Sequence, residues 1–121
     1  MSDPIVIVSA ARTPMGSFQG AFSPLAAHDL GSAVIKTAVE RAGLKPEQVD
    51  EVIFGNVLMA GQGQAPARQA TLKGGLPLST GAATLNKVCG SAMKTIMAAA
   101  DAIKAGSTQV VVAGEIGRAH V

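Results

Sequence analysis

Cys89 is the residue of this chain whose type and setting best suit covalent chemistry. It follows an apolar run at residues 83–86 and comes just before a strongly helical stretch that begins at Ser91. Backbone N–H groups at a helix N-terminus, together with the positive end of the helix dipole, favour the thiolate form of a nearby cysteine. Such N–H groups also stabilise the oxyanion that forms during acyl transfer. The setting therefore indicates a cysteine nucleophile.

A structural role is the alternative for Cys89. A lone cysteine often packs as a small hydrophobic side chain, and from the residues alone the two interpretations are about equally supported. The small residues Gly90, Ser91 and Ala92 that follow leave room for a substrate to approach. The chain has one cysteine and therefore no internal disulfide, which fits a reducing, cytoplasmic compartment.

The elements that would position Cys89 alternate between short β-branched runs and helical stretches. Residues 5–8 are continuously apolar, as expected of a strand covered on both faces. The other strands are predicted at residues 52–58, 83–86 and 110–113, with a connector or short helical turn at residues 45–48. Strands separated by helices predict an α/β fold with a mostly parallel sheet and helices packed on both faces.

Three helices are predicted between these strands. The first covers residues 23–42, with Ser23 as N-cap and Gly43 as the left-handed residue that ends it. The second begins at Pro66 and ends at residue 74, and the third covers residues 91–105. Met93 and Met97, one turn apart in the third helix, are expected to pack in a core.

Composition and charge exclude several classes of protein. Hydrophobic residues make up 48% of the chain and charged residues 15%, which is too apolar for a disordered protein. The net charge is +2, the basic residues are scattered, and there is no Trp or Tyr, so a nucleic-acid surface is not expected. No apolar run approaches the roughly 20 residues that span a bilayer, so no membrane partner is expected either.

Other candidate residues favour structural interpretations. Gly61 and Gly63 lack the rest of a phosphate-binding fingerprint, so loop flexibility is expected there. His28 is expected to be a partly exposed helical residue. Two histidines and one cysteine, far apart in the chain, offer no metal-ligand spacing, so no metal is expected.

Several segments in the same order resemble the thiolase family. Residues 85–96 read LNKVCGSAMKTI and resemble the acyl-enzyme signature of that family. Residues 7–20 read IVSAARTPMGSFQG, and residues 50–57 and 63–69 read DEVIFGNV and GQAPARQ, which are similar to the family's N-terminal strands and helix. The resemblance is continuous from about residue 3 to residue 114 and is strongest to the bacterial acetyl-CoA acetyltransferases of the family.

The resemblance implies the fold, the substrates and the role of Cys89. It implies the N-terminal half of a layered αβαβα body, truncated here, with residues 1–114 as a partial thiolase N-terminal domain. Cys89 would take an acyl group from a coenzyme A thioester, and a second acetyl-CoA would attack the acyl-enzyme to give acetoacetyl-CoA, or the reverse. Coenzyme A thioesters are then substrates, no cofactor is permanently bound, and a homodimer or homotetramer is expected for the full-length family enzyme.

The sequence departs from the family pattern after Gly114. The family continues there with another glycine and a Met-Glu-Ser stretch, so residues 115–121 are interpreted as an atypical tail, from a truncated reading frame or a cloning remnant. The family's second cysteine, its histidine in a Gly-His-Pro setting and its catalytic asparagine do not occur in this sequence. His120, in the tail, is rejected as the base for Cys89. The 121-residue chain is therefore expected to be inactive in the full reaction.

Three alternatives stay open. A 3-ketoacyl-CoA thiolase of fatty-acid degradation differs in acyl-chain preference, which these residues do not define. A non-catalytic fragment or interaction module is motivated by the missing catalytic base. A ketoacyl synthase also places a cysteine at a helix N-terminus in a related fold, but residues 11–14 and 86–91 favour a thiolase.

Overall fold

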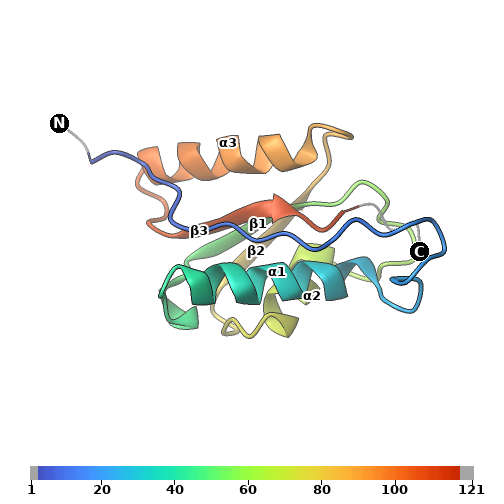
Figure 1. Cartoon of the computed structure of the whole chain (residues 1–121). Helices are drawn as coiled ribbons and strands as arrows, with labels where there is room; N and C mark the ends of the chain where they lie inside the picture. Colours follow the sequence, from blue (N-terminus) through green and yellow to red (C-terminus); the bar gives the residue numbers. More distant parts are fainter. Residues whose placement is uncertain (1–2, 118–121) are drawn as a thin grey trace.

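The computed structural model describes residues 3–117 and places a three-stranded parallel sheet between two helical layers (Figure 1). Strand β1 (Glu51–Gly55) is central, with β2 (Gly81–Leu85) on one side and β3 (Val111–Glu115) on the other. Both pairings are parallel. The predicted α/β class and parallel sheet are confirmed.

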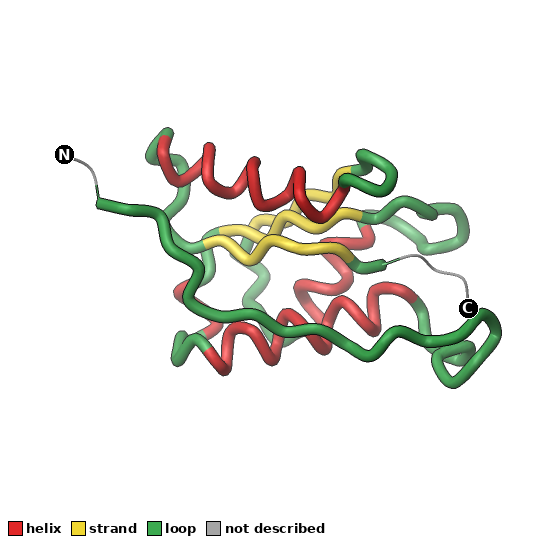
Figure 2. Tube along the Cα trace, turned by 45° about the horizontal axis from the view of Figure 1, so that its top comes forward, coloured by secondary structure: helices red, strands yellow, loops and turns green. Residues whose placement is uncertain are grey.

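Helices cover both faces of the sheet, as the sequence predicts. Helix α3 (Ser91–Lys104) packs on one face, and α1 (Ala27–Arg41) and α2 (Pro66–Lys73) pack together on the other (Figure 1, Figure 2). A single 3-10 turn, η1 (Pro46–Gln48), precedes β1 at the predicted connector. No helix among the described residues is long and apolar enough to cross a membrane.

The main core lies between the sheet and the layer formed by α1 and α2. Four of the five residues of β1 are buried, as expected of a central strand covered on both faces. Ile35 of α1 is fully buried, and Phe54 of β1 is almost so. The other buried apolar side chains of this cluster are Ala27, Val39, Val49, Val52, Ala67, Ala70, Leu76 and Ile116.

Helix α1 begins later than the sequence predicts. Ser23 lies in a turn, where its N–H bonds to the Gly20 carbonyl oxygen at 3.0 Å. Ala26 is the N-cap instead, and Asp29 Oδ2 accepts a hydrogen bond from the Ala26 N–H at 2.9 Å. The prediction of Ser23 as N-cap is therefore wrong, because a carboxylate in the first turn makes the reciprocal bond that fixes the start of the helix.

A left-handed glycine follows each of the three described α-helices, with Gly75 at a φ of 89° after α2, and all three strands have bounds different from those predicted. Gly43 follows α1 with a φ of 70°, and Gly106 follows α3 with a φ of 81°, both in the left-handed region. The prediction for Gly43 is confirmed. Strand β1 ends at Gly55 rather than at residue 58, β2 covers Gly81–Leu85 rather than residues 83–86, and β3 extends to Glu115 rather than ending at residue 113.

Residues 5–8 do not form the strand that was predicted for them. The segment runs beside the outer edge of β3 (Figure 1), but it belongs to no strand and joins no sheet in the described residues, and Ile7 is 81% exposed. β-branched residues favour an extended backbone, whereas a strand also needs a partner edge within hydrogen-bonding distance. Arg41 Nη1 instead donates a hydrogen bond to the Ala10 carbonyl oxygen at 2.9 Å, and this bond keeps the N-terminal segment next to α1.

An open groove separates this N-terminal segment from the sheet. Its volume is about 880 Å³, and it is bordered by residues 5–17, α1, α3 and β3. The wall is largely apolar and includes Val6, Val8, Leu30, Val34, Phe54 and Ile103. Residues 5–8, which were predicted to form a strand covered on both faces, therefore line one wall of this open groove.

Candidate functional site

Cys89 lies in the loop that joins β2 to α3, at the carboxyl end of the parallel sheet. Strand β2 ends at Leu85 and α3 begins at Ser91, so the predicted order of strand, cysteine and helix is confirmed. Figure 2 shows the loops that follow β1 and β2 at the same end of the sheet. The crevice outside the carboxyl ends of parallel strands is where α/β folds commonly bind ligands. Cys89 is exposed there and lines the groove.

The start of α3 provides a favourable electrostatic setting for negative charge. Gly90 is the N-cap, and the first turn carries no acidic residue. The N–H groups of the first helical turn point out of the helix toward its N-terminus and concentrate positive partial charge there. This arrangement can stabilise a thiolate at Cys89 or an oxyanion formed beside it.

Side-chain hydrogen bonds hold the loop around Cys89. Ser91 is fully buried, and its Oγ accepts a bond from the Lys87 N–H at 2.9 Å and donates one to the Val88 carbonyl oxygen at 2.6 Å. Asn86 Oδ1 accepts a bond from the Val88 N–H at 2.8 Å. Sequence reasoning assigned Asn86 no role in the site and treated Ser91 only as a small residue that leaves room for a substrate. The available signal was an asparagine at a strand end, which favours a turn closed by its own side chain.

The outer face of α3 exposes large apolar side chains beside the charged residues Lys94 and Asp101. Met93 is 71% exposed and Met97 is 52% exposed, so the expectation that they pack in a core is wrong for the described chain. The buried residues of α3 are Ser91, Thr95 and Ala99, whose small side chains let the helix lie close to the sheet. Spacing of one turn places the two methionines on one side of the helix without defining which side meets the sheet.

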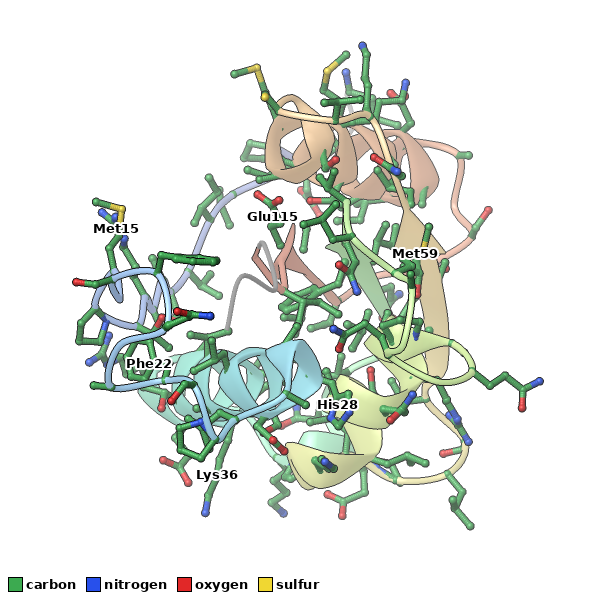
Figure 3. The ribbon with its side chains drawn as sticks, turned by 90° about the vertical axis from the view of Figure 1, so that its right-hand side faces the viewer. Met15, Phe22, His28, Lys36, Met59 and Glu115 are labelled. Atoms are coloured by element: carbon green, nitrogen blue, oxygen red, sulfur yellow. The ribbon has the colours of Figure 1, made fainter. Side chains whose placement is uncertain are left out.

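Glu115, at the end of β3, lines the same groove as Cys89. Figure 3 shows the Glu115 side chain in the space between α3 and the N-terminal loop that carries Met15 and Phe22. Both of those side chains also line the groove. A carboxylate and a thiol therefore face one largely apolar groove.

The region after Gly114 is partly built into the fold. Glu115 is the last residue of β3, and Ile116 is buried in the core, where its N–H bonds to the Gly55 carbonyl oxygen at 2.8 Å. The predicted division at residue 114 stays a prediction. His120 lies outside the described residues.

His28 belongs to a polar cluster on the opposite face of the sheet from α3. Its Nδ1 lies 2.9 Å from Lys73 Nζ, and Lys73 Nζ donates a hydrogen bond to Asp29 Oδ1 at 2.8 Å. The hydrogen bond from Lys73 has the largest effect on the pKa of Asp29 and lowers it from its usual value. The hydrogen bond from the Ala26 N–H lowers it further. His28 is partly exposed on α1, as expected (Figure 3). Residues 3–117 contain no group of three or more side chains arranged to hold a metal ion.

The glycines of the loop after β1 serve its geometry. Gly61 and Gly63 have φ values of 76° and 80°, which glycine adopts readily. Gln69 Nε2 donates hydrogen bonds to the carbonyl oxygens of Gln62 and Gln64, at 2.8 and 2.7 Å. This loop is therefore braced by α2 around its left-handed glycines.

Asn56 is a buried polar residue that the sequence analysis did not single out. It directly follows β1 and is fully buried, and neither atom of its amide group has a hydrogen-bond partner in the described residues. A buried amide in that state costs free energy. The sequence signal is one polar residue inside the apolar run at residues 52–58.

Comparison with known families decides what kind of chain this is. The family model described as "Thiolase, N-terminal domain" matches residues 5–117. The chain belongs to the thiolase family. The resemblance found in residues 7–20 and 85–96 is thereby confirmed, as is the N-terminal position of this segment within the family fold.

Named relatives of this thiolase chain are acetyl-CoA acetyltransferases. The enzyme from Cupriavidus necator is 60% identical over 110 residues, which are 91% of this chain and 28% of the relative. The mitochondrial enzyme from Xenopus tropicalis is 62% identical over 91% of this chain and 26% of its own length. A cytosolic enzyme from Gibberella zeae is 59% identical over 92% of this chain and 28% of its own length.

A solved thiolase has the same fold over this region. The crystal structure of Acat5 thiolase from Ascaris suum in complex with coenzyme A superposes with a TM-score of 0.86 at 46% identity, covering 88% of this chain and 28% of that one. The thiolase chain described here thus spans a little over a quarter of the length of the relatives it matches.

Proposed function

We propose that this thiolase segment carries the acyl-accepting part of an acetyl-CoA acetyltransferase, with Cys89 as the nucleophile. The observation that carries the proposal is the position of Cys89, exposed between β2 and the N-terminus of α3 inside the segment that matches the family. The names of the relatives support acetyl transfer between coenzyme A thioesters as the reaction.

The first step is transfer of an acetyl group to Cys89. The thiolate attacks the carbonyl carbon of acetyl-CoA, a carbon–sulfur bond to Cys89 forms, and the bond to the coenzyme A sulfur breaks. Coenzyme A leaves as its thiolate and takes up a proton from solvent. The N-terminal N–H groups of α3 favour the negative charge that develops in this step. The covalent intermediate divides a difficult condensation into two easier steps.

The second step requires a base that removes a proton from the α-carbon of another acetyl-CoA, after which the carbanion attacks the acetyl-cysteine and gives acetoacetyl-CoA. Of the two histidines, His28 lies on α1, across the sheet from α3, and His120 lies outside the described residues. We therefore propose the complete reaction, and its reverse thiolysis, for a protein of the length of the relatives. For the 121 residues alone we propose acetyl transfer to Cys89 without condensation.

Coenzyme A thioesters are the proposed substrates. The neighbouring Ascaris suum thiolase is described as a complex with coenzyme A. No permanently bound cofactor is proposed. We propose a homodimer or homotetramer for the full-length enzyme. We also propose a cytoplasmic location, which the bacterial and cytosolic relatives support, whereas other relatives are mitochondrial.

Acetyl transfer to Cys89 is tested by incubating the chain with acetyl-CoA and measuring its intact mass. We expect a gain of one acetyl group, located on Cys89 by peptide mapping and removed by neutral hydroxylamine as a thioester is. Cys89→Ala should take up none. A folded chain that acquires no acetyl group, or acquires it equally in the Cys89→Ala variant, contradicts the proposal.

Competence in the full reaction is tested with a chimera. Residues 5–117 of this chain, which the family model matches, replace the corresponding segment of the Cupriavidus necator enzyme, which is 60% identical to this chain over 110 residues. We expect acetoacetyl-CoA thiolysis in the chimera and its loss after Cys89→Ala. Activity toward longer 3-ketoacyl-CoA substrates in preference to acetoacetyl-CoA would favour the degradative thiolase instead.

One observation favours a second candidate, a non-catalytic interaction module. The groove and the outer face of α3 expose contiguous apolar side chains, and exposed apolar patches mark surfaces that associate. An acetylation-negative chain that still forms stable assemblies would support this alternative.

A further inference from the structure

The residue before the proposed nucleophile holds a backbone conformation that its side chain disfavours. Val88 has a φ of 48°, in the left-handed region, where a β-branched side chain crowds the backbone. Such a conformation costs free energy and persists only where the surrounding structure enforces it. Contacts of the neighbouring residues must therefore keep Val88 in place.

Two side chains hold the peptide groups on both sides of Val88. Asn86 accepts a hydrogen bond from the Val88 N–H at 2.8 Å, and Ser91 donates one to the Val88 carbonyl oxygen at 2.6 Å. The Val88 carbonyl and the Cys89 N–H belong to one planar peptide unit. The bond from Ser91 therefore also fixes the direction of the Cys89 N–H.

Both side chains are anchored outside the loop. Asn86 Nδ2 donates a hydrogen bond to the Val57 carbonyl oxygen at 3.3 Å, which ties the loop to the segment after β1. Ser91 is fully buried against Gly55, the last residue of β1. The position of the loop relative to the central strand is thus set by these two residues.

We propose that Ser91 and Asn86 are positioning residues for Cys89. They hold Val88 in its left-handed conformation and so fix the direction in which Cys89 presents its sulfur to a thioester. The inference rests on the proposed role of Cys89. Neither residue is a catalytic one, because the Ser91 hydroxyl is taken up by Lys87 and Val88 and the Asn86 amide by Val57 and Val88.

The test compares a reaction that depends on orientation with one that does not. The acetyl thioester of N-acetylcysteamine, which lacks the nucleotide part of coenzyme A, transfers its acetyl group to Cys89, and iodoacetamide alkylates the same sulfur. In the full 121-residue chain we expect Ser91→Ala to slow acetyl transfer about tenfold and to change alkylation by less than about twofold. Asn86→Asp keeps the acceptor oxygen for Val88 and should lose less rate than Asn86→Ala.

A rescue variant separates positioning from general damage. Glycine adopts a positive φ without a side-chain clash, so Val88→Gly removes the strain that the two side chains oppose. In the Ser91→Ala, Val88→Gly double variant, the logarithm of the acetyl-transfer rate should recover by about half or more of the decrease that Ser91→Ala alone causes. If Ser91→Ala slowed acetyl transfer only by destabilising the fold, then adding a more flexible glycine at position 88 would not raise the rate.

Thr95→Val is the matched control. Thr95 is fully buried on the same helix, one turn after Ser91, and its hydroxyl donates to the carbonyl oxygens of Ala92 at 2.6 Å and Gly114 at 3.2 Å, neither of which belongs to the loop. We expect both of its rates to equal those of the unmodified chain. Equal acetyl-transfer rates in Ser91→Ala and the unmodified chain, or an equal loss in Thr95→Val, would overturn the proposal.

The outcome also distinguishes this proposal from the proposed function. A chain that reacts with the small thioester in a Ser91-dependent way, yet takes no acetyl group from acetyl-CoA, keeps the positioning roles and loses the proposed function. A chain whose folded state reacts with the small thioester no faster than its urea-unfolded state has no positioned nucleophile, and the positioning proposal then fails.

Discussion

Gly55 lies so close to Ser91 that a Cβ atom at position 55 would be 2.7 Å from Ser91 Cβ. The first residue of α3 therefore rests directly on the last residue of β1. Because the Cys89 loop ends at Ser91, the central strand determines where the proposed nucleophile lies.

Gly55→Ala is expected to displace the start of α3. The added methyl group meets the Cβ and backbone of Ser91 rather than a flexible side-chain end, so the helix must move. Overpacking of this kind lowers the free energy of unfolding by about 1–3 kcal/mol, and acetyl transfer to Cys89 should slow as well. Urea unfolding and the small-thioester reaction measure the two effects. Gly81→Ala is the control, because a Cβ atom at position 81 would be 3.9 Å from its nearest neighbours, an ordinary van der Waals distance. Equal behaviour of the two variants would contradict the prediction.

Asp50 makes the stability of the sheet depend on pH. Its Oδ2 accepts hydrogen bonds from the N–H groups of Gln109 and Val110 at 2.7 and 2.9 Å, and these bonds lower the pKa of Asp50 from its ordinary value of 3.8. A carboxyl with a lowered pKa in the folded state stabilises the fold above its unfolded pKa, and this contribution is lost as the pH falls through the folded value. Asp50→Ala should therefore be less stable than the unmodified chain at pH 7.

The difference between the two chains should shrink as the pH falls below about 4. Urea unfolding at a series of pH values measures it. Asp50→Asn keeps an uncharged acceptor and should fall between the two chains at pH 7. A stability difference that stays constant down to pH 2 would show that the Asp50 carboxylate charge is not responsible.

The outer face of α3 is expected to drive self-association. Met93, Ile96 and Met97 are all at least half exposed on this face, and the groove adds further apolar surface. Met93→Lys should lower the average mass measured by sedimentation at a given concentration, with little loss of stability because the side chain is exposed. Ala33→Lys adds the same charge at an exposed position of α1 and should leave association unchanged. Similar masses for the two variants would place the associating surface elsewhere.

Asn56→Leu is expected to stabilise the 121-residue chain. The Asn56 amide is buried without hydrogen-bond partners in the described residues, so an apolar side chain removes its desolvation cost. The expected gain is about 1 kcal/mol in the free energy of unfolding. Asn56→Asp should lower it instead, because a buried charge is costlier than a buried amide. A loss of stability in Asn56→Leu would indicate that the amide is hydrogen-bonded in solution.

Elements with strong local signals were predictable from the sequence. Helix α3 has its predicted start at Ser91, α2 begins at Pro66, and Gly43 follows α1 with the left-handed φ that its position predicts. Each of these depends on neighbours within a few residues. The strand predicted at residues 5–8 was wrong for the opposite reason. An extended backbone is a local property, but joining a sheet requires a ladder of hydrogen bonds to an edge strand, and residues 5–8 belong to no strand of the described sheet.

The sequence predicted Cys89 as the central residue of the candidate site but not the side chains that shape the loop around it, again because local signals do not report contacts with distant strands. Cys89 was identifiable from its type and from the strand and helix on either side of it. The roles of Asn86 and Ser91 were not, because the acceptor at Val57 and the packing surface at Gly55 belong to another strand and its loop. Sequence spacing cannot say which backbone atoms of a distant strand will face a side chain.

The parallel register has a consequence for how this chain folds. Glu51 pairs with Gly81, thirty residues later, and with Val111, sixty residues later, so the described sheet contains no hairpin that could nucleate it. Topologies with such high contact order fold slowly, because long loops must close before any pairing is rewarded.

The side-chain hydrogen bonds of Asn86 and Ser91 join residues within 57–91, and the contact between Ser91 and Gly55 adds the end of β1. During synthesis on the ribosome, these residues emerge before β3 does. The contacts that Asn86 and Ser91 make around the proposed nucleophile are thus encoded in a segment that emerges early, and β3 pairs with β1 only after these residues have left the ribosome.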